Sequence, residues 1–103
     1  MEKNLTVIAH IFAKADEEQR LKTALLDLVA QTRKEKGCIN YDLHQSQENA
    51  CQFVMYENWE SAADLDAHAN SAHLREFGRN MSQFLQRPTQ ITKWNMVSEL
   101  GNS

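Results

Sequence analysis

Imidazole and carboxylate side chains gather among large aromatics between Tyr56 and Phe77, and they are the residues of this chain best suited to chemistry. His68 lies three residues after an apolar position of a predicted helix, so it should point toward the interior. His73 lies four residues before Phe77 and shares its edge of the same helical stretch. An imidazole that titrates near neutral pH can take a proton from a bound molecule. The segment therefore predicts a pocket with a titratable wall.

Glu57 lies between Tyr56 and Trp59 in a predicted central strand. A buried carboxylate has to be hydrogen-bonded, paired or protonated. Glu57 either pairs with a basic group as a structural element, or has a raised pKa that suits it to act as an acid or base. Tyr56 and Trp59 are either plain core aromatics or walls of a pocket for a flat aromatic ligand.

Each histidine also has a structural interpretation. His68 could be a core histidine whose ring nitrogens bond to the backbone, and His73 could be half exposed. His10 shares one face of the first predicted strand with Ile8 and Phe12. If that face meets the helices, His10 points toward the same cavity as His68, but strand alternation alone does not say which face does.

Metal and nucleotide chemistry are not favoured. His68 and His73 are five residues apart, about 140° around an ideal helix, which suits one metal ion only if a helix break near Ser71 realigns them. The three glycines are isolated, so there is no phosphate-binding loop for a nucleotide cofactor. We expect no metal and no cofactor.

The elements that must position these residues follow the order β-α-β-β-α-β. We expect a strand at 5–13, a helix from an N-cap at Asp16 to a C′ residue at Gly37, a hairpin of strands at 39–44 and 51–59, a helix capped by Ser61 that breaks near Asn70 and Ser71 and ends before Pro88, and a strand at 90–97. Four strands with helices on one face make an α+β, ferredoxin-like fold, here with a broken second helix.

The expected sheet has apolar residues on both faces, although the helices can cover only one. A second copy of the chain would bury the other face, so we predict a symmetric homodimer. The 103 residues make one domain, 1–103, with loose termini at 1–3 and 99–103. A net charge of −3 disfavours a nucleic-acid partner. The short apolar runs and the lack of a signal-peptide pattern predict no membrane partner and a cytoplasmic location.

Several short motifs together resemble those of the antibiotic biosynthesis monooxygenase domain family. They are Leu5-Thr6-Val7-Ile8-Ala9, Lys36-Gly37-Cys38 followed by Tyr41, and Tyr56-Glu57-Asn58-Trp59 with Ser61, Leu65, His68, Ser71, His73 and Phe77. Within that family the chain is most similar to small bacterial quinol monooxygenase-like proteins. The resemblance implies a dimeric α+β barrel of ferredoxin-like subunits that oxidises electron-rich phenols or quinols with O2, often without metal or flavin.

The implied chemistry is physically sensible, because a deprotonated polyphenol can itself give an electron to oxygen. The protein then has to supply a base, hold the ring and exclude water. The resemblance implies His68 as the base, the aromatics as walls, and His73 or His10 as groups that orient the substrate. The candidate catalytic residues are thus His68 and His73, and the candidate substrate-binding residues are His10, Tyr56, Glu57, Trp59 and Phe77.

Two alternatives remain for the function. Some family members bind and degrade haem with a histidine late in the second helix, an asparagine and a tryptophan. This chain has Gly78, Ile8 and His68 at those places, and the departures count against haem. The other alternative is a non-catalytic dimeric module that binds a small ligand.

Overall fold

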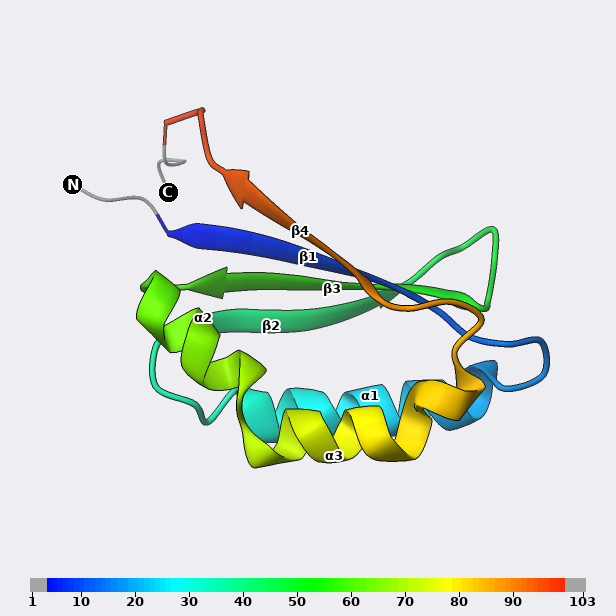
Figure 1. Cartoon of the computed structure of the whole chain (residues 1–103). Coiled ribbons are helices and arrows are strands. Elements are labelled where there is room, and N and C mark those ends of the chain that lie inside the picture. The colour runs from blue at the N-terminus through cyan, green and yellow to red at the C-terminus, as the bar shows by residue number, and fades with distance from the viewer. Residues whose placement is uncertain (1–3, 100–103) are drawn as a thin grey trace.

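The computed structural model describes residues 4–99, which form one four-stranded sheet with the helices on one of its faces (Figure 1). The elements are β1 (Leu5–Phe12), α1 (Glu18–Thr32), β2 (Cys38–Gln45), β3 (Gln52–Trp59), α2 (Ala62–Ala69), α3 (Ala72–Met81), the 3-10 turn η1 (Ser82–Phe84) and β4 (Gln90–Asn95). The strand order is β2-β3-β1-β4, and every neighbouring pair is antiparallel. The predicted α+β, ferredoxin-like fold is confirmed.

Some predictions on the chain ends fall outside this range. Residues 1–3 and 100–103 of the expected loose termini lie outside the described residues. Within residues 4–99, no helix combines the length and apolar character that a membrane span requires.

The two faces of the sheet differ in what covers them. Val7, Ala9 and Ile11 of β1 are buried beneath the helices, and they alternate with residues of the open face. That open face includes two large aromatics, Tyr56 and Trp94, whose exposed fractions are 37% and 53%. Figure 1 shows that the helices lie on one side of the sheet only. The open face is therefore the face that a second copy could cover.

Helix α1 packs on the sheet through Leu21, Leu25 and Leu28, which recur at helical spacing and are buried. Its predicted limits are wrong at both ends. Asp16 does not cap it, because that residue has a left-handed φ of 68° and the helix begins two residues later. It ends at Thr32 rather than at the predicted glycine, and a turn segment follows it.

The predicted break in the second helix is confirmed. The Ser61 hydroxyl caps α2 by accepting a hydrogen bond from the Asp64 backbone N–H at 3.1 Å. The Ser71 hydroxyl caps α3 in the same way, from the Leu74 N–H at 3.4 Å. The C-cap of α2 at Asn70 and the N-cap of α3 at Ser71 separate the helices, so the chain changes direction between them (Figure 1).

Several strand limits also differ from the prediction: β1 ends and β3 begins one residue inside the predicted range, and β2 ends one residue beyond it. β2 begins at Cys38, one residue earlier than expected, and its pairing with β3 is irregular between Cys38 and Asn40. β4 ends at Asn95 rather than at residue 97, because its pairing with β1 stops opposite Leu5.

Candidate active site

A cavity of about 400 Å³ lies between the covered face of the sheet and the helices. It is lined mainly by apolar side chains from β1, β3 and all three helices, among them Val7, Ala9, Ile11, Leu25, Leu28, Met55, Leu65, Leu74 and Phe77. This volume falls within the range of roughly 300–1,000 Å³ that is typical of small-molecule sites. The cavity can therefore accommodate a small, mostly apolar ligand.

His68 is the histidine that lines this cavity, and it is 4% exposed. It lies in the last turn of α2. Its ring is tilted over the Trp59 indole with centroids 4.8 Å apart, and it meets the Tyr41 ring edge to face at 5.3 Å. Two aromatic contacts thus fix the imidazole in one orientation at the cavity wall.

Glu35 lies in the turn segment that follows α1, and it contacts the His68 ring at Nδ1. Its Oε2 lies 2.9 Å from His68 Nδ1, and the carboxylate is only 15% exposed. The turn that carries Glu35 ends at Gly37, whose φ of 81° is in the left-handed region, and an added Cβ there would overlap the Asp64 side chain of α2. A glycine is therefore needed for this turn to approach α2 closely.

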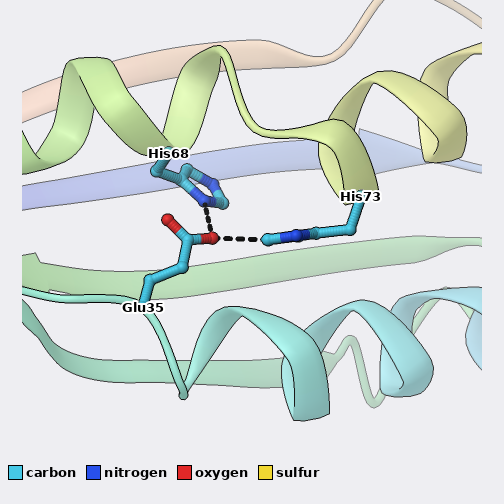
Figure 2. A group of neighbouring side chains, drawn as sticks. All are labelled: Glu35, His68 and His73. Carbon is cyan, nitrogen blue, oxygen red and sulfur yellow. Dashed lines mark hydrogen bonds and ion pairs between the residues drawn. The ribbon is translucent and has the colours of Figure 1, made fainter.

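His73 reaches the same carboxylate oxygen from the first turn of α3. Its Nε2 lies 2.5 Å from Glu35 Oε2, and its side chain is 20% exposed. Figure 2 shows Glu35 between the two rings, with a dashed line to each. The helix break at Ser71 allows this arrangement, because two residues five apart on one helix would point in different directions.

These three side chains are also the types that bind a divalent metal, and their potential ligand atoms lie within 4.8 Å of one another. Ligands that share one ion at about 2.1 Å stand roughly 3 Å or more apart. His73 Nε2 and Glu35 Oε2 lie closer together than two ligands of one ion would, in a contact that is short even for a hydrogen bond. As it stands, the cluster is a hydrogen-bonded triad, and a metal ion would have to separate it.

Glu57 places a second carboxyl group on the cavity wall, and it is 4% exposed. Its Oε1 accepts a hydrogen bond from the Trp59 indole N–H at 2.9 Å. Burial raises the pKa of Glu57 to about 7, the Trp59 hydrogen bond lowers it in part, and the charge of Glu35 raises it again. Its hydrogen-bond partner is thus an indole, and no basic group within residues 4–99 pairs with it, against the structural alternative.

The cavity opens between the helices and β4, where its lining residues become exposed. They are Asp66 and Ala69 of α2, Gly78 of α3, and Ile91 and Lys93 of β4. A Cβ added at Gly78 would meet no atom within 4 Å. This glycine leaves an open space in the cavity wall.

The structure brings together only some of the predicted site residues. His68, Glu57 and Phe77 line the cavity. His73 lines a separate groove of about 220 Å³ between α1 and α3, which Phe77 also lines. Trp59 is fully buried and supports the His68 ring from behind, so it is not a cavity wall.

The predicted positions of His10 and Tyr56 in the pocket are wrong. Tyr56 pairs with Ile8, and His10 with Val54, on the open face of the sheet. His10 lies 3.4 Å from the Thr92 hydroxyl there. The residues next to them in sequence, such as Ala9 and Glu57, face the helices. Because side chains alternate along a strand, those of His10 and Tyr56 point to the open face instead.

Sequence reasoning missed Glu35. It lies in a short charged stretch that resembles a solvated helix end, and its partners are 33 and 38 residues away. The one local signal is the glycine two residues later, which forces a tight turn. That signal locates the turn but does not say what the carboxylate contacts.

Comparison with family models shows which known proteins the chain is similar to. A model described as antibiotic biosynthesis monooxygenase matches residues 4–80, which include β1 and almost all of α3. A Mycobacterium tuberculosis protein provisionally named a monooxygenase, Rv0793, is 30% identical over 92 residues, which are 89% of this chain and 90% of that protein. YcnE of Bacillus subtilis, with the same provisional name, is 27% identical over 82% of this chain and 90% of its own length.

Solved structures extend the similarity to nearly the whole fold. PA3566 from Pseudomonas aeruginosa superposes with a TM-score of 0.89 at 36% identity, covering 95% of this chain and 98% of that one. The structure of Rv0793 gives a TM-score of 0.87 at 28% identity, with 96% and 100% covered. The elements around the cavity are thus within the matched region.

Proposed function

The chain belongs to the antibiotic biosynthesis monooxygenase family, and from this premise we propose that it oxidises a small electron-rich aromatic, a quinol or polyphenol, with O2. The single observation that carries the proposal is a buried histidine on the wall of an apolar cavity, with its Nδ1 bonded to a carboxylate. The family match supports a monooxygenase, and the cavity supports an aromatic substrate.

The proposed reaction needs no reductant besides the substrate. A hydroquinone with a free ring C–H loses a hydroxyl proton, and the anion gives an electron to O2. The resulting radicals combine at the ring carbon, and that carbon loses its hydrogen as a proton when the peroxide O–O bond breaks. One oxygen atom stays on the ring and the other leaves as water. One hydroquinone and one O2 thus become one hydroxyquinone and one water molecule, and the ring gives up all four electrons that reduce the oxygen.

His68 is the proposed base. A carboxylate only accepts hydrogen bonds, so His68 Nδ1 donates to Glu35 and the lone pair of the neutral ring is on Nε2. That nitrogen is available to a substrate hydroxyl in the cavity. When the ring becomes cationic, the nearby carboxylate stabilises it.

The other walls hold and shield the ring. Phe77 and Leu74 offer apolar contact area to a flat ligand, and the buried surroundings exclude water from a reactive intermediate. The Oε1 atom of Glu57 is bonded to the indole, so Oε2 remains to bind a substrate hydroxyl. Because the pKa of Glu57 is about 7, its carboxyl group can be neutral or ionised near neutral pH, and either form can make this hydrogen bond. His73 acts from outside the cavity, through Glu35.

Oxygen uptake with a panel of hydroquinones tests this proposal. His68→Gln should lower the rate by about 100-fold, the lower end of what a proton-transfer group contributes. His44→Gln is the matched control, since His44 is exposed on β2 away from the cavity. With ¹⁸O2, one labelled atom should enter the product. A His68→Gln variant at full rate would exclude His68 as the base.

We also propose that two copies pair through the open face of the sheet. The observation behind this is the large exposed area of Trp94 and Tyr56 on a face that no helix covers. Trp94→Glu should convert a dimer to a monomer in light scattering, whereas Leu26→Glu, on the exposed side of α1, should not. A wild-type monomer at micromolar concentration would contradict the pairing.

A further inference from the structure

His68 and His73 face two different hollows that share one apolar partition. His68 lines the larger cavity, and His73 lines the groove between α1 and α3. Leu28 and Phe77 line both spaces, so they separate the two. Glu35 connects the two histidines through a single oxygen atom, at 2.9 Å and 2.5 Å (Figure 2). The triad thus links the two sides of the partition.

We propose that Glu35 and His73 form a proton route between the cavity and the groove, through which His68 exchanges protons with solvent while a substrate fills the cavity. The inference rests on the proposed function, because it gives His68 the role of base. Glu35 and His73 are positioning residues in this scheme, since they act on the substrate only through His68.

The route takes up one proton from the substrate at His68 and releases one proton from His73 to water in the groove. In the proposed scheme, the cycle starts with Glu35 as a carboxylate that accepts from both imidazoles and with a proton on each ring nitrogen of His73. When a substrate proton joins His68 Nε2, the Nδ1 proton moves to Glu35 Oε2. His73 then no longer faces an anion, and it gives its Nδ1 proton to water in the groove.

The same steps run in reverse after the O–O bond breaks. The departing oxygen takes the proton on His68 Nε2 and leaves as water. His68 Nδ1 regains its proton from Glu35, and groove water returns a proton to His73. Between these two stages the positive charge has left His68 for the groove water. The neutral His68 ring is then less able to return its proton to the substrate anion.

The charges around the triad suit this exchange. Asp27 and Glu76 line the groove beside His73, and Gln31 and Asn80 add further polar groups that can contact water there. On the cavity side, the ionisable groups near Glu35 are Cys38, Tyr41 and Glu57. Burial raises the pKa of the Tyr41 hydroxyl and of the Cys38 thiol, so these two stay neutral.

Hydrogen exchange of the His68 Nδ1 proton tests the route without any turnover. Its rate is measured by NMR on the full chain labelled with ¹⁵N-histidine, in the wild type and in His73→Gln. We expect His73→Gln to slow the exchange by about tenfold, because the variant cannot release a proton into the groove. A change that merely loosened the structure would speed it. Unchanged or faster exchange would overturn the proposal.

Turnover gives a second readout. In dilute buffer, His73→Gln should lower the oxygen-uptake rate by about tenfold without changing KM, and added imidazole should restore it, as an external proton carrier. His44→Gln should show neither effect. A slow variant that imidazole does not restore would contradict the route. If the wild type oxidises no quinol, the proposed reaction fails, and the exchange measurement still decides the route.

Discussion

The buried carboxyl of Glu57 makes the stability of this fold depend on pH in a direction that can be worked out. It is 4% exposed, and its hydrogen bond to the Trp59 indole does not offset the loss of water. Its pKa is about 7 in the fold against 4.5 for the free group, and burial is the main cause. The pKa of Glu57 is higher in the fold than in the unfolded chain. The contribution of protonated Glu57 to the free energy of unfolding is therefore fully present below pH 4.5 and is lost as pH rises through 7.

Replacing Glu57 by Gln removes this dependence while keeping a carbonyl oxygen for the indole. A pKa difference of 7 − 4.5 = 2.5 corresponds to about 3 kcal/mol, at about 1.4 kcal/mol per unit. Glu57→Gln should therefore be more stable than the wild type by about 3 kcal/mol at pH 8, and by under about 0.5 kcal/mol at pH 4.5. Most of the change should fall between these two pH values.

Urea unfolding followed by tryptophan fluorescence measures the difference, because Trp59 is fully buried. Comparing variant with wild type at each pH cancels the titration of all other groups, and a fixed protein concentration cancels any effect of dimerisation. Glu76→Gln, on the exposed side of α3, should show no comparable change. A difference between Glu57→Gln and the wild type that is the same at both pH values would refute the reasoning.

Three further changes test other parts of the site. Gly37→Ala should lower the free energy of unfolding by about 2 kcal/mol or more in urea, since it adds left-handed strain and a clash with Asp64; equal stability would show that the turn adapts. Gly78→Ala should stabilise α3 by up to about 1 kcal/mol and leave KM unchanged. Gly78→Phe should raise KM by narrowing the mouth of the cavity. A KM of Gly78→Phe equal to that of the wild type would place the entrance elsewhere. Ser71→Ala should cost about 1 kcal/mol by removing the cap of α3 and should slow turnover through His73, and a stable variant with unchanged turnover would contradict the importance of the break.

Local sequence patterns predicted the order of the elements and the division of the second helix. Leu21, Leu25 and Leu28 follow one side of α1 at helical spacing, and the structure buries all three. Ser61 and Ser71 are residues that favour caps, and each caps a helix. These features depend on neighbours within one or two turns, which a sequence displays directly.

The choice of sheet face could not be predicted, because both faces of β1 are rich in apolar residues. That pattern is expected if the open face is itself covered by a second copy. Strand alternation nevertheless excludes part of the predicted site, since Tyr56 and Glu57 are neighbours in β3 and cannot both point into one cavity. Once the cavity is known to lie on the Glu57 side, Tyr56 and the residues paired beside it belong to the other face.

Glu35 shows why the centre of the site lies beyond local pattern. Its neighbours in sequence are basic and exposed, so its own stretch resembles a solvated helix end. What brings it into contact with both histidines is a meeting of three separate chain reversals: the turn closed by Gly37, the last turn of α2, which carries His68, and the restart of the chain at Ser71 that presents His73. Each reversal has a local cause, but their convergence on one carboxylate oxygen depends on how the helices pack on the sheet. The catalytic proposal therefore depends on the packing of these turns as much as on the identity of the histidines.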